Sequence, residues 1–269
     1  MKQLSLKDIQ ATGLEIMLDF QKICAENGLT FFLCGGTLLG AIRHKGFIPW
    51  DDDVDVMMPR PDYDRLMQLE KDKHVLPSHL KLFSYEMGNA FFPFAKVVHM
   101  KTYVKQEHVE DESLNHIWID IMPVDGLPGD QKKVVKIYKK VSKLRTILTL
   151  CWAKMGHGTN VFRRFSKLLL IPIAKSFGAK FWCKRIDRIS RTYKYDDSDY
   201  VGVISWGLYG EGERCPKHSF VTSVSVEFEG YSFDSISGWD DYLRGIYGNY
   251  MELPPENKRH EHLLEAWRE

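Results

Sequence analysis

Apolar residues recur every three or four positions near the start of the chain, which is the spacing of an amphipathic helix. This pattern covers residues 5–27 and stops before a glycine, a favourable helix end. Residues 30–34 form a short apolar run typical of a buried strand, and residues 53–58 alternate acidic and apolar side chains with the period of a strand. Between the two strands, the pattern predicts a turn at Gly35-Gly36 and a short helix over residues 37–43.

The remaining pattern also mixes helices and strands. It predicts a helix over 62–71; strands over 80–85, 91–99, 102–105 and 117–122; helices over 131–155 and 161–190, the second kinked at Pro172; strands over 200–205 and 225–233; and a helix over 239–247. This order favours an α+β fold. We expect a mixed-sheet core with flanking helices in residues 1–130, a helical subdomain in 131–195, and a part in 196–269 that completes the core.

Composition narrows the class of protein. The chain has 269 residues, of which 44% are apolar and 13% aromatic, enough for a buried core and too many for a disordered chain. Its five cysteines are an odd number without a CxxC pair, so neither a disulfide framework nor a zinc ribbon is indicated. The first 20 residues lack the apolar core of a secretion signal, and the longest uncharged run, 28–42, is too short to span a membrane. We therefore expect a cytoplasmic protein.

Charge is divided unevenly along the chain, although the net charge is only +1. Residues 132–194 hold 18 Lys and Arg and a single acid, whereas the rest of the chain holds 19 bases and 35 acids. Such segregation indicates one surface for an anionic partner and another that handles cations.

Three interpretations of the basic segment are open: a solvated helical face, a nucleic-acid surface, or a surface for anionic lipid. No nucleic-acid motif accompanies the charge, so we expect no nucleic-acid partner. The stretch LLLIPIAKSFGAKFW, residues 168–182, combines a strong apolar face with flanking cations, as helices at a membrane interface do. The segment 132–194 therefore predicts docking on an anionic membrane surface.

The candidate chemistry lies in FFLCGGTLLGAIRHKGFIPWDDDVDVMM, residues 31–58. On a strand, Asp53 and Asp55 point to the same face, a spacing that suits Mg²⁺, or Mn²⁺ as the alternative, beside a diphosphate. Gly35 and Gly36 allow a phosphate to approach the backbone, and the helix that starts at Thr37 offers free N–H groups. Either motif alone is weak, but together they predict a metal and phosphate site.

Two more polar residues stand in apolar strands. Asp120 lies within Ile-Trp-Ile-Asp-Ile, and Lys96 lies within Phe-Pro-Phe-Ala-Lys-Val-Val. A buried charge without a partner is costly, so we expect Asp120 to share the metal or to act as a base, and Lys96 to contact a diphosphate. Asp51 and Asp52 are expected either to orient the metal ligands or to form a solvated turn.

These motifs together resemble the LicD-type phosphotransferases, relatives of the fukutin group in the nucleotidyltransferase superfamily. The resemblance is carried by GGTLLGAIRHKGFIPWDDDVDV, FPFAKVV, NHIWIDIMPVDGLPGD and DDYLRGIYGNYMELPPENKRHEH. It covers about residues 1–130 and 200–269 and is weak in the basic middle.

The resemblance implies a nucleotidyltransferase-like fold, with Asp53 and Asp55 as the metal-binding pair and Asp120 as a third, catalytic carboxylate. It also implies Mg²⁺-dependent transfer of phosphocholine from CDP-choline to a hydroxyl of a glycan precursor of the teichoic acid type, with release of CMP. Two alternatives stay open: a metal-dependent transferase with CDP-ribitol, an NTP or a UDP-sugar as donor, and a non-catalytic nucleotide-binding protein at the membrane.

Further contacts follow from the same resemblance and from charge. Arg43 ends the short helix and is within reach of phosphate oxygens, and Arg259 and His260 are candidates for contact with the nucleotide. The spacing of His260 and His262 does not suit a zinc site. Choline is a quaternary ammonium and needs aromatic faces, for which Trp50 is the first candidate. A lipid-linked acceptor, expected for this family, places the protein at the inner face of the plasma membrane.

Overall fold

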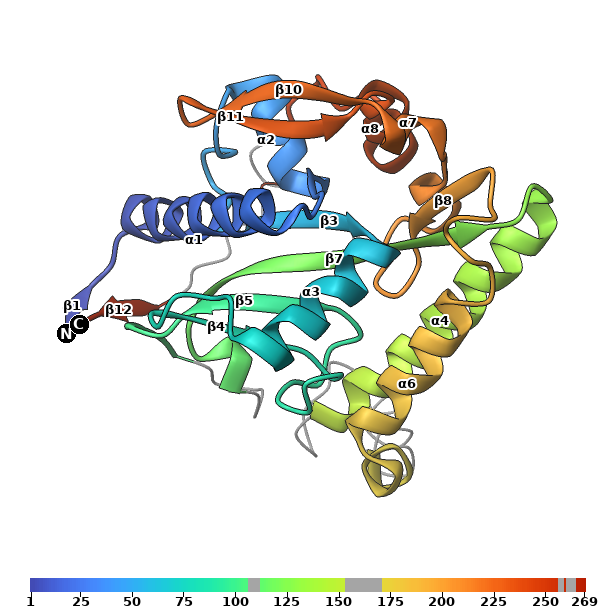
Figure 1. The fold of residues 1–269 in the computed structure, drawn as a ribbon, viewed down its shortest axis with the longest axis horizontal. Coiled ribbons are helices and arrows are strands. Elements are labelled where there is room, and N and C mark those ends of the chain that lie inside the picture. The colour runs from blue at the N-terminus through green and yellow to red at the C-terminus, as the bar shows by residue number, and fades with distance from the viewer. Residues whose placement is uncertain (106–111, 153–170, 256–258, 260–264) are drawn as a thin grey trace.

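A seven-stranded mixed sheet forms the centre of the molecule (Figure 1). The computed structural model describes residues 1–105, 112–152, 171–255, 259 and 265–269. Strand β7 lies in the middle: its first part pairs with β5, its middle with β3 and its last part with β8. Among the described strands of this sheet only the β3–β7 pair is parallel, and the strand order is β2-β3-β7-β5-β4, with β8 and then β9 added beside β7. The architecture confirms the expected α+β, nucleotidyltransferase-like fold.

The strands are β1 (Lys2–Gln3), β2 (Phe32–Leu33), β3 (Asp55–Pro59), β4 (Leu80–Phe83), β5 (Ala95–His99), β6 (Thr102–Val104), β7 (Ile117–Leu127), β8 (Tyr200–Val203), β9 (Cys215–Pro216), β10 (Ser223–Phe228), β11 (Tyr231–Ile236) and β12 (Ala266–Arg268). The helices are α1 (Leu6–Asn27), α2 (Gly35–His44), α3 (Arg60–Lys73), α4 (Gln131–Trp152), α6 (Ala179–Ser190), α7 (His218–Val221) and α8 (Trp239–Tyr247), with short 3₁₀ helices at η1 (Glu112–Leu114) and η2 (Gly210–Glu213). Residues 171–177 are also helical.

Helix α1 has local signals at both ends. The Ser5 and Asp8 side chains form a reciprocal capping box at its start, and Gly28, with φ of 60°, ends it in the left-handed conformation. Its apolar stripe, which includes Ile16 and Phe20, is buried against the sheet. Strand β12 pairs with β1 and β6, so the two described ends of the chain lie side by side (Figure 1).

Helices α4 and α6 lie against each other beside β8 (Figure 1). They share a small apolar core with β7 and β8, built on Val134, Tyr138, Cys183 and Ile186. The described part of the predicted 161–190 helix is interrupted at Gly178, whose φ of 76° does not fit a continuous helix. Residues 153–170, which hold the end of the first predicted helix and the start of the second, lie outside the described residues. None of the described helices is both long and apolar enough to cross a membrane.

Other predicted boundaries were wrong for local reasons. The predicted strand 225–233 is the hairpin β10–β11, because Glu229 and Gly230 both have positive φ and form a tight turn. The predicted strand 91–99 begins only at Ala95, because Phe92 and Phe94 pack their rings against Trp206 ahead of it.

Helix α2 is packed closely against the loop that follows it, which generates a prediction. A Cβ atom at Gly40 would lie 2.4 Å from the Gly46 carbonyl oxygen and 3.3 Å from the Ile48 nitrogen. We expect Gly40→Ala to lower the free energy of unfolding by about 1–3 kcal/mol, despite the better helix propensity of alanine. Urea unfolding measures the change, with Gly129→Ala as the control, because nothing lies within 4 Å of a Cβ there. Equal stability of the two variants would contradict the close packing.

Candidate active site

Three polar residues stand side by side on adjacent strands. Asp55 on β3 is the register partner of Asp120 on β7, and Asp120 is the register partner of Lys96 on β5. Register partners point to the same face of a sheet. The structure therefore brings together two of the three predicted carboxylates and the predicted lysine, although 65 residues separate Asp55 from Asp120.

Three aromatic rings surround the ammonium group of Lys96. Its side chain is 3% exposed, and its Nζ atom lies 4.9 Å from the ring centre of Phe92, 5.1 Å from that of Phe94 and 4.5 Å from that of Trp118. The ammonium group donates a hydrogen bond to Oδ1 of Asp120. Cation–π attraction and this ion pair together offset the cost of burying the charge.

The carboxylates repel one another at close quarters. Burial raises the pKa of Asp55 well above its ordinary value, and the nearby charges of Asp120 and Asp53 raise it further. Burial also raises the pKa of Asp120, while Lys96 acts in the opposite direction. One lysine does not balance this much negative charge, so the site favours an additional cation.

Asp53 lies ahead of the strand and not on it. Strand β3 begins at Asp55, so the prediction of a strand from residue 53 was wrong. The two ladders set this start: the pairing with β2 stops at Leu33 and Val56, where the chain enters α2, and the pairing with β7 begins at Asp55 and Asp120. Carboxylate oxygens of Asp53, Asp51 and Asp52 lie within 4.8 Å of one another in the preceding loop.

The two glycines form the first turn of α2 and not a turn before it, which corrects the predicted boundary. A Cβ atom at Gly35, where φ is +52°, would lie 3.2 Å from Oδ2 of Asp55. A Cβ atom at Gly36 would lie 2.9 Å from Oδ2 of Asp51. The Thr37 hydroxyl accepts a 2.8 Å hydrogen bond from the backbone N–H of Asp55. The glycines and Thr37 thus let the start of α2 rest directly on the acidic cluster.

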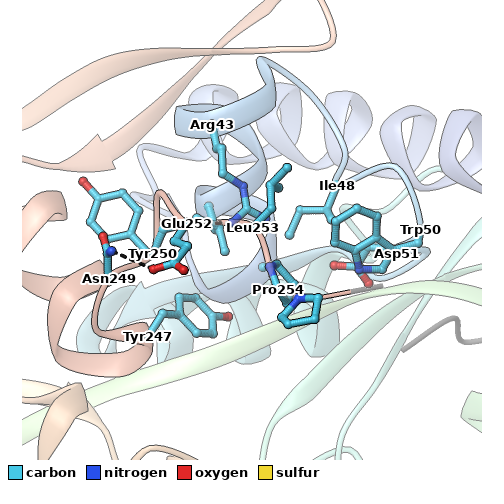
Figure 2. A pocket seen from close by; sticks show the side chains of 13 residues that line it. Arg43, Ile48, Trp50, Asp51, Tyr247, Asn249, Tyr250, Glu252, Leu253 and Pro254 are labelled. Atoms are coloured by element: carbon cyan, nitrogen blue, oxygen red, sulfur yellow. Dashed lines mark hydrogen bonds between the residues drawn. The ribbon is translucent and has the colours of Figure 1, made fainter. Parts of the chain in front are cut away.

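A pocket of about 470 Å³ opens beside this cluster. Figure 2 shows Arg43 pointing from α2 toward its middle, with Trp50 and Asp51 on one side and Tyr247 and Asn249 on the other. Its full lining is Gly36, Leu39, Arg43, Ile48, Trp50, Asp51, Tyr247, Asn249, Tyr250, Glu252, Leu253, Pro254 and Pro255. Asp51 lines the pocket, and its carboxylate lies within 4.8 Å of those of Asp52 and Asp53, so the pocket adjoins the acidic loop that leads into β3.

Two arginines flank the pocket. Arg43 donates a 2.8 Å hydrogen bond from Nη1 to the Tyr250 carbonyl oxygen, and burial lowers the pKa of its guanidinium. The Arg259 guanidinium lies 4.7 Å from the ring centre of Trp50, and its Nε donates to the Pro254 carbonyl oxygen at 3.2 Å. The structure thus brings the predicted residues Arg43, Trp50 and Arg259 to one place. The fourth, His260, lies outside the described residues.

Sequence reasoning missed the C-terminal wall of the pocket. Tyr247 ends α8, and Tyr250 and Glu252 follow it; all three line the cavity opposite α2. Their signal was the run Tyr-Gly-Asn-Tyr-Met-Glu in the last quoted motif, in which aromatic and polar residues alternate with a glycine. A pattern of that kind does not show which distant segment it will face.

The cluster fits a hard divalent cation. Mg²⁺ takes oxygen ligands and is commonly held by one or two carboxylates together with substrate phosphate. Asp55 and Asp120 are adjacent, partly buried and raised in pKa by desolvation, and Asp53 lies near enough to raise both of these pKa values further. A bound cation would relieve this repulsion.

Comparison with known proteins agrees with the geometry. A family described as the LicD/FKTN/FKRP nucleotidyltransferase domain matches residues 28–146, a range that contains the glycines, the carboxylates and Lys96. The chain is also 30% identical over 279 aligned residues to the lipopolysaccharide cholinephosphotransferase LicD of Haemophilus influenzae, and the alignment covers 99% of both chains. The chain belongs to the LicD family. The resemblance drawn from the motifs is confirmed.

Shorter stretches of this LicD-family chain match two uncharacterized rickettsial proteins. One, from Rickettsia typhi, is 27% identical over 125 residues, which is 46% of this chain and 38% of that protein. The other, from Rickettsia prowazekii, is 38% identical over 55 residues, or 20% and 21% of the two chains.

Glu213 of this LicD-family protein is a buried carboxyl group that the sequence pattern did not indicate. Its side chain belongs to η2, which packs against α8, and the residue is 6% exposed. Burial raises the pKa of Glu213 from its ordinary value of 4.5 to about 8, while hydrogen bonds from the Tyr209 and Leu208 backbone and the charge of Arg145 limit the rise. Its ionised form is therefore destabilising in the folded chain.

This shift predicts a pH dependence of stability. Between pH 4.5 and about 8 the folded chain keeps a proton on Glu213 that the unfolded chain has lost, so its contribution to stability falls as the pH rises. Relative to the wild type, Glu213→Gln should therefore gain about 2–3 kcal/mol of unfolding free energy between pH 6 and pH 8.5. Urea unfolding at both pH values measures the gain. The exposed neighbour Glu211→Gln is the control, and a gain of the same size there would contradict the assignment to Glu213.

Proposed function

We propose that the chain transfers phosphocholine from CDP-choline to a hydroxyl of a cell-surface glycan precursor and releases CMP. The observation that carries the proposal is the register of Asp55, Asp120 and Lys96 across three strands, beside a pocket flanked by arginines. The proposal is supported by the family and by the relative named as a lipopolysaccharide cholinephosphotransferase.

The reaction is a phosphoryl transfer. The acceptor hydroxyl oxygen attacks the phosphorus that carries choline, a new P–O bond forms, and the bond from this phosphorus to the bridging oxygen of the diphosphate breaks. The electron pair of that bond leaves with CMP, and the hydroxyl proton passes to a base. Catalysis of this kind depends mainly on position and charge.

Asp53, Asp55 and Asp120 are the proposed ligands of a magnesium ion. When bound, Mg²⁺ would supply positive charge that offsets the negative charge of the diphosphate and of the departing CMP. The alternative role for Asp120 is that of the proton acceptor: burial raises the pKa of its carboxyl group, which favours uptake of a proton if this group does not hold the metal. Lys96 fixes the orientation of Asp120 through its hydrogen bond and keeps a positive charge beneath the phosphates.

The pocket is the proposed donor site. Gly35 and Gly36 leave room for phosphate oxygens at the start of α2, where free N–H groups favour anions. Arg43 and Arg259 add positive charge on the pocket side of the cluster. Trp50 is the proposed aromatic contact for choline, which would take the place that the Arg259 guanidinium holds 4.7 Å from the ring centre.

The acceptor class has two candidates of the same chemistry. The glycan hydroxyl belongs either to a precursor of the teichoic acid type, as proposed from the motifs, or to a lipopolysaccharide precursor like the substrate in the relative's name. Both are chains of sugars that carry free hydroxyl groups, so both belong in the assay.

CMP release tests the proposal. We expect Mg²⁺-dependent CMP release from CDP-choline in the presence of a glycan acceptor, and a loss of at least about a thousandfold in Asp55→Asn and Asp120→Asn, because each substitution removes a proposed ligand of the cation that offsets the phosphate charge. Asp234→Asn, on the exposed face of β11, is the matched control and should keep full activity. CDP-ribitol, CTP, ATP and UDP-sugars complete the donor panel.

Two outcomes would overturn the proposal. One is a faster release of nucleotide from another donor than from CDP-choline with every acceptor tried. The other is undiminished CMP release in Asp55→Asn.

A further inference from the structure

A short helical segment lies at the lower end of the α4–α6 pair (Figure 1). It exposes large apolar side chains. Ile173 and Phe177, on the helical residues 171–177, are each 55% exposed. They lie on one short segment and are separated by four positions, which puts them on the same face of the helix. We call this segment with the start of α6, residues 171–186, the helical foot.

Aromatic contacts make the foot a built surface. The rings of Phe177 and Phe181 stack with centres 5.0 Å apart and planes 27° apart, and the Trp182 ring meets both edge-on at 5.7 and 5.0 Å. The Trp182 Nε1 donates a 3.1 Å hydrogen bond to the Ala174 carbonyl oxygen. These contacts fix the exposed Phe177 ring against α6, so it is presented outward from an ordered base.

The foot carries only positive charge. Residues 171–186 contain Lys175, Lys180, Lys184 and Arg185 and no acid. All four side chains are exposed, and the Arg185 guanidinium lies 5.7 Å from the Phe181 ring centre. The first acid beyond them, Asp187, is 14% exposed and paired with Arg60 and Arg191, so it does not neutralise the surface.

The lysines of α4 lie apart from the foot. Lys132, Lys133, Lys136, Lys139, Lys140 and Lys143 are all exposed, but the foot meets the other end of α4, where the Cys151 thiol donates a 3.4 Å hydrogen bond to the Ala174 carbonyl oxygen. Even Lys143 is eight residues, about 12 Å, further along the helix, so the cations of the foot are its own lysines and arginine. Apolar side chains ringed by lysine and arginine match an interface of hydrocarbon below and anionic headgroups around it. An acidic protein partner would match the charge but not the two isolated apolar side chains that project from it.

We propose that the helical foot inserts Ile173 and Phe177 into the surface of an anionic lipid bilayer, with Lys175, Lys180 and Lys184 on the headgroups. The purpose of this contact rests on the proposed function, since a lipid-linked glycan acceptor lies at such a surface. Figure 1 places the foot at the opposite end of the molecule from α2 and α8, which carry the donor pocket. The foot therefore acts as a tether, separate from the catalytic residues.

Vesicle sedimentation tests the tether with the full-length chain. Vesicles of neutral phosphatidylcholine are compared with vesicles that contain 30% phosphatidylglycerol. We expect the wild type to bind the anionic vesicles at least tenfold more tightly than the neutral ones, and Phe177→Ser to weaken that binding about tenfold or more by loss of buried apolar area. Lys175→Glu combined with Lys180→Glu should weaken it at least about 25-fold, because each basic group near an anionic surface contributes about fivefold.

Matched controls separate the foot from general effects. Tyr231→Ser removes an aromatic ring that is 49% exposed on the β10–β11 hairpin, and Lys71→Glu with Lys73→Glu makes the same change in net charge at the end of α3. Both should bind vesicles within about twofold of the wild type. Circular dichroism of each variant checks that it is folded.

The outcomes also separate the tether from the proposed function. Equal binding to neutral and anionic vesicles, no binding at all, or wild-type binding by folded foot variants would each overturn the tether. CMP release with a soluble, lipid-free glycan acceptor should be unchanged in the foot variants. If that release is absent in the wild type while vesicle binding follows the pattern above, the proposed donor fails and the tether stands.

Discussion

The ion pair between Lys96 and Asp120 is the constraint on which the site depends, because it exists only if β5 and β7 keep one register. A slip of one residue between the two strands would turn one of the two side chains to the opposite face, where Ala95, Val97 and Ile121 are buried, and would break the pair. The parallel pairing of β3 with β7 then sets Asp55 beside Asp120. Burial of three charges is costly, and the aromatic rings around Lys96 offset only part of the cost. The surplus of negative charge is what makes this point of the sheet suited to a cation and a diphosphate.

The same register explains why segments distant in sequence meet at the pocket. Helix α2 can start directly over Asp55 because its first two residues are glycines, and the backbone N–H of Asp55 is tied to the Thr37 hydroxyl. The Gly35 N–H in turn donates a 3.3 Å hydrogen bond to the Tyr242 hydroxyl of α8. Through these two hydrogen bonds the sheet positions α2, and α2 positions the C-terminal wall that carries Tyr247 and Tyr250.

Local signals made much of this arrangement predictable. The cap of α1, the glycines of α2 and the isolated charges at Lys96 and Asp120 were all visible as departures from a simple apolar pattern. The pattern did not show which other segment each strand or helix pairs with or packs against. Asp53 lies ahead of β3 because the pairing with β2 stops at Val56 and the pairing with β7 begins at Asp55. The long helix breaks at Gly178 because a glycine there adopts positive φ. The pocket wall after α8 depends on a contact with a segment some 200 residues earlier, which no local pattern records.

The division of charge along the sequence corresponds to a division in space. The proposed metal ligands lie at the start of β3, in the loop before it and on the neighbouring part of β7. The lysine-rich helices α4 and α6 lie beside β8, with their foot pointing away from α2 (Figure 1). Beyond one Debye length, about 8 Å at physiological salt, each charged surface is screened from the other. A basic tether and an acidic, cation-binding site can therefore coexist in one nearly neutral chain. Had the lysines been spread over the whole surface, they would have competed with a divalent cation for the carboxylates.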